Sequence, residues 1–165
     1  MSGKADLIHE RNRNMKIIRI VLYILFFPYI IYLDWKKEEA FKNADWEKLI
    51  SSLRSSQRFR GLTPRDLFLL GYAHSKLGRF KEAKRFMEFM QTPLENKDEE
   101  ACRYCTHAWI LYKLGKVDQS KAVLSQAMSE SWPSYRIEWA KDFLDSMAKA
   151  EFLADDIFHP RLQIH

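Results

Sequence analysis

The stretch from Leu67 to Met90 constrains the fold more than any other part of the chain. Its sequence, LFLLGYAHSKLGRFKEAKRFMEFM, indicates two short amphipathic helices joined at Gly78. In each half, four residues, all but one of them apolar or small, recur at helical spacing, which places them on one helical face. These residues are Leu67, Leu70, Gly71 and His74, then Phe80, Ala83, Met87 and Met90. One helical pair cannot bury such faces alone, so the pattern predicts neighbouring pairs.

Three small residues in this stretch carry a family resemblance. The segment LGYAHSKLGRFKEA resembles the middle of a tetratricopeptide repeat, which has small residues at the positions of Gly71, Gly78 and Ala83. Gly71 and Ala83 allow the two backbones to approach closely, and Gly78 supplies the left-handed residue that ends the first helix. His74 departs from the family, which usually has Tyr there. The resemblance implies stacked helical hairpins that serve as a binding scaffold.

Weaker matches lie on both sides of this hairpin. Ala44 lies 34 residues before Gly78, which is the usual length of one repeat. Gly115 lies 37 residues after Gly78, so three extra residues are expected in the loop near Thr92–Glu99. The resemblance therefore predicts a repeat region over residues 36–132, with repeats at about 36–60, 64–97 and 98–132.

Local sequence predicts the helices of the outer repeats. In the first repeat, a helix is expected over 45–54 and a polar linker over 55–63; in the third, helices are expected over 102–114 and 116–128. A helix opening at Pro133 has a large apolar residue every four positions, and we expect it to cap the stack over 133–154. These apolar residues are Tyr135, Trp139, Phe143 and Met147. Residues 155–165 form a tail without periodicity.

Residues 17–33, IIRIVLYILFFPYIIYL, form the only long apolar run, uninterrupted for 14 residues from Ile20 to Leu33. As a helix those 14 residues span roughly 21 Å, short of the ~30 Å hydrocarbon core, but Arg19 can extend outward and let two more isoleucines add length. Tyr29, Tyr32 and Trp35 follow where an interfacial aromatic belt is expected. We predict a single transmembrane helix over 15–35, after a polar segment over 1–14. Its anchor residues are Ile20, Leu22, Leu25, Phe26, Phe27, Ile30 and Ile31.

Two other interpretations of this run stay open: a helix buried in a larger assembly, and a helix lying in the membrane surface. Residues 1–33 contain five Lys and Arg, and residues 34–48 contain four Lys. By the positive-inside rule, this small excess favours an N-terminus on the cytoplasmic or matrix side. A mitochondrial or bacterial inner membrane is the expected location. Of the net charge of +5, residues 1–33 hold +3, so the remaining chain carries no nucleic-acid signature.

The segment Cys102-Arg-Tyr-Cys105-Thr-His107 is the one candidate for metal or redox chemistry. Covalent haem attachment needs His directly after the second Cys, but Thr106 intervenes. Zinc needs a fourth ligand, and a redox thiol needs a helix N-terminus to lower its pKa. We expect two half-buried structural thiols, with a metal or redox module as the alternative. Phosphate-loop and catalytic motifs are absent, so no enzyme activity, cofactor or metal is predicted.

In the tetratricopeptide family, the first helix of each repeat lines a concave groove. By position, the groove residues are Phe68, Tyr72, Ser75 and Lys76, then Cys102, Cys105, Trp109, Tyr112 and Lys113. The predicted partner-binding residues among them are Phe68, Tyr72, Lys76, Trp109, Tyr112 and Lys113. Aromatic rings with lysines suit an amphipathic helix or extended peptide of some acidic character. Alternatively, the aromatic residues pack against the protein's own cap or first repeat.

The predicted function is a membrane-anchored protein–protein interaction module, acting as an adaptor, assembly factor or accessory subunit of a membrane protein complex. Its expected protein partner is another protein that is itself membrane-associated. Residues 17–35 are expected to contact the lipid bilayer, and no nucleic acid is expected. A receptor that captures targeting or unfolded segments at a mitochondrial or bacterial membrane is the alternative.

Overall fold

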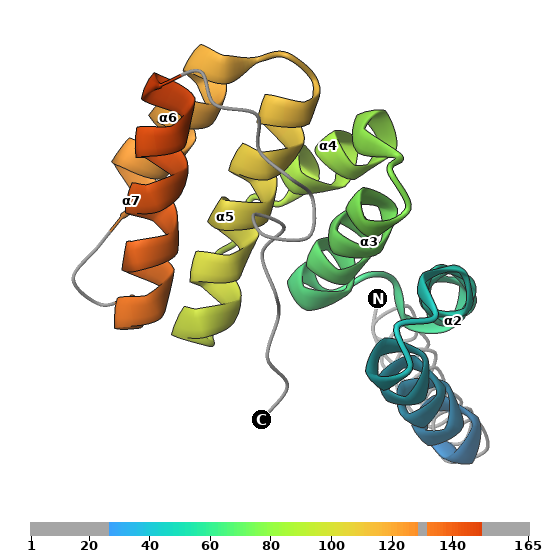
Figure 1. The fold of residues 1–165 in the computed structure, drawn as a ribbon. Coiled ribbons are helices and arrows are strands. Elements are labelled where there is room, and N and C mark those ends of the chain that lie inside the picture. Colours follow the sequence, from blue (N-terminus) through green and yellow to red (C-terminus); the bar gives the residue numbers. More distant parts are fainter. Residues whose placement is uncertain (1–26, 129–131, 150–165) are drawn as a thin grey trace, which may run out of the picture.

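The computed structural model describes residues 27–128 and 132–149, and within these ranges the chain forms helices and turns without a strand (Figure 1). Residues 27–42 are helical. The helices that follow are α2 (Trp46–Arg60), α3 (Pro64–Lys76), α4 (Phe80–Phe89), α5 (Lys97–Lys113), α6 (Val117–Ala127) and α7 (Ser134–Ala148). The all-α prediction is therefore confirmed for the described part of the chain.

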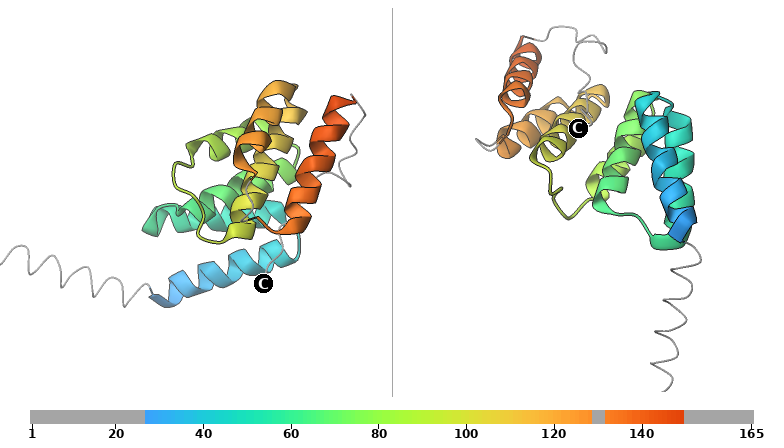
Figure 2. Two further views of the ribbon diagram at one scale, coloured as in Figure 1. Left: turned by 90° about the vertical axis from the view of Figure 1, so that its left-hand side faces the viewer. Right: turned by 90° about the horizontal axis from the view of Figure 1, so that it is seen from below.

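Successive helices pair and then stack. The helix of residues 27–42 lies beside α2, α3 pairs with α4, and α5 pairs with α6, while α7 contacts both α5 and α6. The pairs stack because α3 and α4 each also contact α5, and α2 contacts α3. Helix 27–42 and α7 consequently lie at opposite ends of the molecule (Figures 1 and 2).

The core runs through every one of these junctions. Leu53 of α2 and Leu70 of α3 are buried with Ala40 in one cluster. Larger side chains fill the other two clusters: Phe68, Met87 and Cys102 between the α3–α4 pair and α5, and Trp109, Leu124 and Phe143 between α5, α6 and α7. Each pair thus buries its apolar face only against its neighbours, as the pattern predicted.

The α3–α4 hairpin is closed by the small residues named above. A Cβ atom at Gly71 would lie 2.8 Å from Met87 Cε and 3.3 Å from the carbonyl oxygen of Ala83, so the close backbone approach is confirmed. Gly78 has φ of +69°, as expected for the left-handed residue of the turn. His74 is buried and stacks on Phe86 with 5.4 Å between ring centroids; burial lowers its pKa and favours the neutral ring.

Two expected helix bounds were wrong. The linker expected over 55–63 is helical up to Arg60, because residues 55–60 contain neither Gly nor Pro, and the helix ends only at Gly61, which has a left-handed φ of +78°. The helix expected from Cys102 begins at Lys97, where the Asn96 side chain accepts hydrogen bonds from two backbone N–H groups of the first turn. The α4–α5 connection spans residues 90–96, in the region where extra residues were expected.

None of the described helices is both long and apolar enough to span a membrane. Residues 15–26 of the predicted transmembrane helix lie outside the described residues, and with them Ile20, Leu22, Leu25 and Phe26. Of the remaining predicted anchor residues, Phe27 and Ile31 are exposed and Ile30 is half-buried. The last residues of the apolar run, 27–33, and the polar residues 34–42 that follow them form one helix without a break.

The contact at Gly71 yields a stability prediction. Gly71→Leu should lower the free energy of unfolding by about 3 kcal/mol, because the new side chain must displace Met87 and push α4 away from α3. Urea unfolding followed by far-UV circular dichroism measures the change. Lys81→Leu, on the exposed side of α4, is the control and should shift stability by about 0.5 kcal/mol at most. Equal stability of the two variants would contradict this packing.

Candidate partner-binding surface

The six predicted partner-binding residues lie on neighbouring helices α3 and α5, and we call them the inner surface. They divide by burial: Phe68 and Trp109 are fully buried and Tyr72 is 3% exposed, whereas Lys76, Tyr112 and Lys113 are half-buried. Ser75, Cys102 and Cys105, which share these helices, are also buried. Lys76, Tyr112 and Lys113 are therefore the least buried of the six residues, and we call these three the rim of the inner surface.

Tyr72 packs toward the first helical pair. Its ring centroid lies 6.0 Å from that of Phe41 and 5.7 Å from that of Trp46, and Phe68 contacts its other side at 6.0 Å. The rings cross mostly edge to face, which is a favourable aromatic arrangement. This is the packing against the first repeat that the sequence left open as an alternative.

Trp109 packs toward the cap. Its ring lies 5.8 Å from Phe143 of α7 and 5.9 Å from Tyr112, and Phe143 in turn stacks on Trp139 at 4.9 Å. Phe143 is fully buried by these contacts. The aromatic side chains that recur along α7 thus pack over α5, and Trp109 is part of the core between the two helices.

The two rim lysines lie over these buried rings. Lys76 Nζ is 5.4 Å from the centroid of Tyr72, and Lys113 Nζ is 4.8 Å from the centroid of Trp109. Each lysine follows its aromatic residue by four positions, so the same pair recurs on α3 and on α5. Cation–π attraction holds each ammonium group above a ring and fixes positive charge along the rim.

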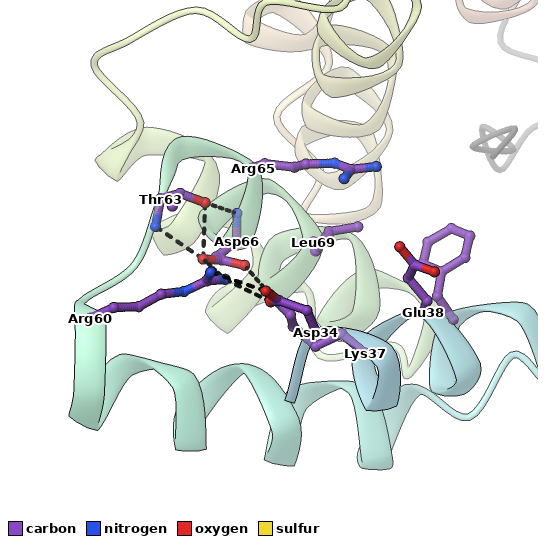
Figure 3. A pocket seen from close by; sticks show the side chains of 9 residues that line it. Asp34, Lys37, Glu38, Arg60, Thr63, Arg65, Asp66 and Leu69 are labelled. Atoms are coloured by element: carbon purple, nitrogen blue, oxygen red, sulfur yellow. Dashed lines mark hydrogen bonds and ion pairs between the residues drawn. The ribbon is translucent and has the colours of Figure 1, made fainter. Parts of the chain in front are cut away.

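A pocket lies between helix 27–42 and α3, with a cavity volume of about 390 Å³ (Figure 3). We call it the inter-repeat pocket. Its lining residues come from three successive elements: Asp34, Lys37, Glu38, Phe41, Arg60, Thr63, Arg65, Asp66 and Leu69. Glu38 and Arg65 are exposed. Arg65 Nη2 lies 2.7 Å from Glu99 Oε1 and so links α3 to α5.

Asp66 is the buried centre of the polar network in this pocket, as Figure 3 shows. Its carboxylate accepts hydrogen bonds from the Thr63 backbone N–H at 3.1 Å, the Thr63 hydroxyl at 2.9 Å and Lys37 Nζ at 3.2 Å. Arg60 Nη2 approaches at 3.5 Å. Burial acts to raise the pKa of Asp66, but the Thr63 hydrogen bonds and the charge of Lys37 outweigh it and hold the pKa below its usual value.

This network joins the first repeat to the second. Thr63 and Asp66 form a capping box that starts α3, while Lys37 comes from the preceding pair and Arg60 from the end of α2. Asp34 completes the cluster, 2.6 Å from Lys37 and 3.0 Å from Arg60. The sequence Thr63-Pro-Arg-Asp66 carries a visible capping signal, but no local signal indicates that Lys37, 29 residues away, contacts Asp66.

A similar ion pair joins the third repeat to the cap. Arg136 of α7 is 3% exposed, and its Nε donates to Asp98 Oδ1 over 2.8 Å. Tyr135 also donates to the Asp98 carboxylate. Since Asp98 lies in the first turn of α5, its charge also favours the start of that helix. Each outer junction of the stack therefore has one buried acid–base contact.

The two thiols are deeply buried and belong to different core clusters. Burial raises the pKa of Cys102 to about 11 and raises that of Cys105 further, so the reactive thiolate is disfavoured at neutral pH. Among the described residues, no group of three or more His, Cys, Asp or Glu side chains is arranged to hold a metal ion. The described surroundings of the two thiols therefore favour neither redox chemistry nor metal binding at this pair.

This arrangement defines a class, the stacked α-helical repeat proteins. Within it, residues 67–88, which cover most of α3 and α4, match the tetratricopeptide repeat family. The match supports that family for this part of the chain, and tetratricopeptide repeats are typically non-enzymatic modules that bind other proteins. Comparison with curated proteins and with solved structures found no match.

The polar network predicts a stability change that depends on pH. Asp66→Asn should lower the free energy of unfolding by about 2 kcal/mol at pH 7, because a buried acceptor for two basic side chains loses its charge. Since the pKa of Asp66 is lowered from 3.8, the stabilisation is present above that value and is lost as pH falls through the folded-state pKa.

Urea unfolding of both forms between pH 7 and pH 3 tests this change. Asp34→Asn is the matched control, because Asp34 contacts the same two basic residues but its side chain is 44% exposed; it should cost about 0.5 kcal/mol. Equal costs for the two variants at pH 7, or a cost of Asp66→Asn that is as large at pH 3 as at pH 7, would contradict the assigned role of Asp66.

The buried thiols predict selective reactivity. The native chain should take up almost no maleimide at pH 7, and the urea-unfolded chain should take up two labels, one at each cysteine. Mass spectrometry counts the labels. Rapid labelling of the native chain would show that α5 is open or that the thiols are activated.

Proposed function

We propose that the chain is a membrane-anchored module that binds another protein and acts as an adaptor, an assembly factor or an accessory subunit of a membrane protein complex. One observation carries the proposal. The tetratricopeptide hairpin α3–α4 has a helical pair packed on each side, so the first helices of three pairs lie next to one another. Such an array offers a long surface for a polypeptide rather than an enclosed site for a small molecule.

The rim of the inner surface and the inter-repeat pocket form the proposed binding site. Lys76 and Lys113 contribute positive charge from adjacent first helices, and the half-buried ring of Tyr112 lies one residue before Lys113. Carboxylates on a partner would complement the two lysines, and an apolar side chain would contact Tyr112. The buried Tyr72 and Trp109 hold the lysines in position through their ring faces.

The inter-repeat pocket extends this site toward the first repeat. Half-buried Phe41 and Leu69 supply apolar surface there, and exposed Glu38 and Arg65 supply one charge of each sign. We propose that a partner segment crosses from this pocket to the lysine rim, as an amphipathic helix or an extended peptide. Its acidic side chains would face α3 and α5.

The membrane anchor is proposed from residues 15–35. The continuous helix over residues 27–42 supports a short, stiff connection between the apolar run and the first repeat, so the helical stack would lie close to the bilayer. We propose a mitochondrial or bacterial inner membrane. The N-terminus would lie on the cytoplasmic or matrix side and the helical stack on the other, as the basic-residue count favours.

Charge reversal at the rim tests the binding site. The double variant Lys76→Glu, Lys113→Glu should recover at least about tenfold less partner when the tagged full chain is purified from its own membranes in mild detergent. The control Lys81→Glu, Lys141→Glu reverses two exposed lysines on α4 and α7, outside the inner surface, and should recover the normal amount. Quantitative mass spectrometry gives the partner-to-chain ratio.

The same purification distinguishes a subunit or assembly factor from a receptor. A partner in fixed stoichiometry indicates a subunit or assembly factor. Many substoichiometric proteins, released by free acidic peptides at micromolar concentration, would indicate a receptor for targeting or unfolded segments instead. Equal recovery by the rim variant and its control would contradict the proposed site.

A further inference from the structure

Exposed large apolar side chains gather at one end of the molecule. Among the described residues, eight such side chains are exposed, and six of them lie on helix 27–42 and at the end of α2; the other two are Phe89 and Tyr135. The six are Trp35 (57% exposed), Ile31 (52%), Phe59 (49%), Tyr32 (48%), Phe27 (45%) and Tyr29 (40%). We call these six residues the aromatic end patch.

The patch is one continuous surface built from two helices. The rings of Tyr29 and Phe59 meet edge to face with 5.1 Å between centroids, although Phe59 belongs to α2. Tyr29 lies 6.3 Å from Tyr32, and Tyr32 lies 6.2 Å from Trp35. Helix 27–42 and α2 run antiparallel, which brings the C-terminal end of α2 beside the start of the described chain (Figure 2).

Basic side chains border the aromatic rings. Lys36 Nζ lies 5.9 Å from the centroid of Tyr32, and Arg58 is exposed next to Phe59. Two acids also lie at this end. Asp34 is neutralised by Lys37 at 2.6 Å and Arg60 at 3.0 Å, whereas Glu38 is exposed one turn beyond the aromatic residues. Amphipathic rings flanked by Lys and Arg are typical of the lipid headgroup region, where the basic groups contact phosphates.

The position of the patch along the chain indicates what contacts it. Tyr29, Ile31 and Tyr32 belong to the uninterrupted apolar run that ends at Leu33, so whatever surrounds that run also borders the patch. Phe59 extends the same surface onto α2, which is not part of the run. Exposed apolar side chains gathered in this way mark an interaction surface, and the bilayer is the surface that is continuous with the proposed anchor.

We propose that the aromatic end patch lies at the membrane–water interface, with the anchor residues Phe27 and Ile31 on its hydrocarbon side and the rings of Tyr29, Tyr32, Trp35 and Phe59 in the lipid headgroup region. The helical stack then contacts the bilayer through Phe59 of α2 as well as through its anchor helix. This inference rests on the membrane anchor proposed above and adds the orientation of the domain. Two contacts fix both the tilt and the rotation of the stack. The cap α7, at the opposite end of the stack, then points away from the lipid.

A fluorescent probe at Phe59 tests the contact. The full-length Phe59→Cys variant, labelled with a nitrobenzoxadiazole maleimide, is reconstituted into vesicles of phosphatidylcholine and phosphatidylglycerol with nitroxide-bearing lipids. Cys102 and Cys105 are buried, so the new thiol takes the label. Glu138→Cys, on the exposed face of α7, is the matched control. Arg58→Cys is a second test site that leaves the Tyr29–Phe59 contact in place.

The expected result is several-fold stronger quenching by nitroxide lipids at positions 59 and 58 than at position 138. Equal quenching at all three positions, in a chain that stays with the vesicles during flotation after an alkaline wash, would overturn the lipid contact while leaving the anchor intact. Protection of position 59 in native membranes but not in lipid vesicles would assign the patch to a protein partner and also overturn it. A chain that does not float would refute the anchor itself.

Discussion

The close contact between α3 and α4 is the interaction on which the rest of the structure depends. Gly71 lets the backbone of α3 approach Ala83 and Met87, and the resulting hairpin has apolar side chains on both flanks: Leu70 toward α2, and Phe68 with Met87 toward α5. Exposing these apolar side chains to water is unfavourable. The hairpin therefore packs against α2 on one side and against α5 on the other. The order of helices along the chain then becomes their order in space.

Buried polar contacts determine how the pairs are aligned. Asp66 receives hydrogen bonds from its own capping residue and from Lys37 of the preceding pair, while Asp98 receives them from Arg136 of the cap. An acid at the start of a first helix is thus bound by a base from the adjacent element at both outer junctions. Apolar packing tolerates sliding between helices, whereas these directional contacts favour one register. The rim lysines and the inter-repeat pocket consequently keep fixed relative positions.

The sequence predicted the features that depend on local pattern. Gly71, Gly78 and the periodicity of α7 are visible because each acts within one hairpin or one helix. The sequence left the burial of Phe68, Tyr72 and Trp109 open as an alternative to partner binding. Local pattern could not decide between the two, because the burial depends on residues distant in the sequence: Phe41, 31 residues before Tyr72, and Phe143 of α7, which contacts Trp109. The same is true of the Asp66–Lys37 and Asp98–Arg136 contacts, and of Phe59, which meets Tyr29 only after the chain has reversed.

The proposed function requires that a membrane-anchored helical stack present its lysine rim to another polypeptide. Cross-linking mass spectrometry of the full chain in its own membranes tests it most directly. We expect Lys76 and Lys113 to cross-link to acidic residues of one other protein when a carboxyl-activating reagent is used, and we expect no such cross-link from Lys141 on α7. Cross-links from the rim lysines only to residues of their own chain, with the partner attached elsewhere, would contradict it.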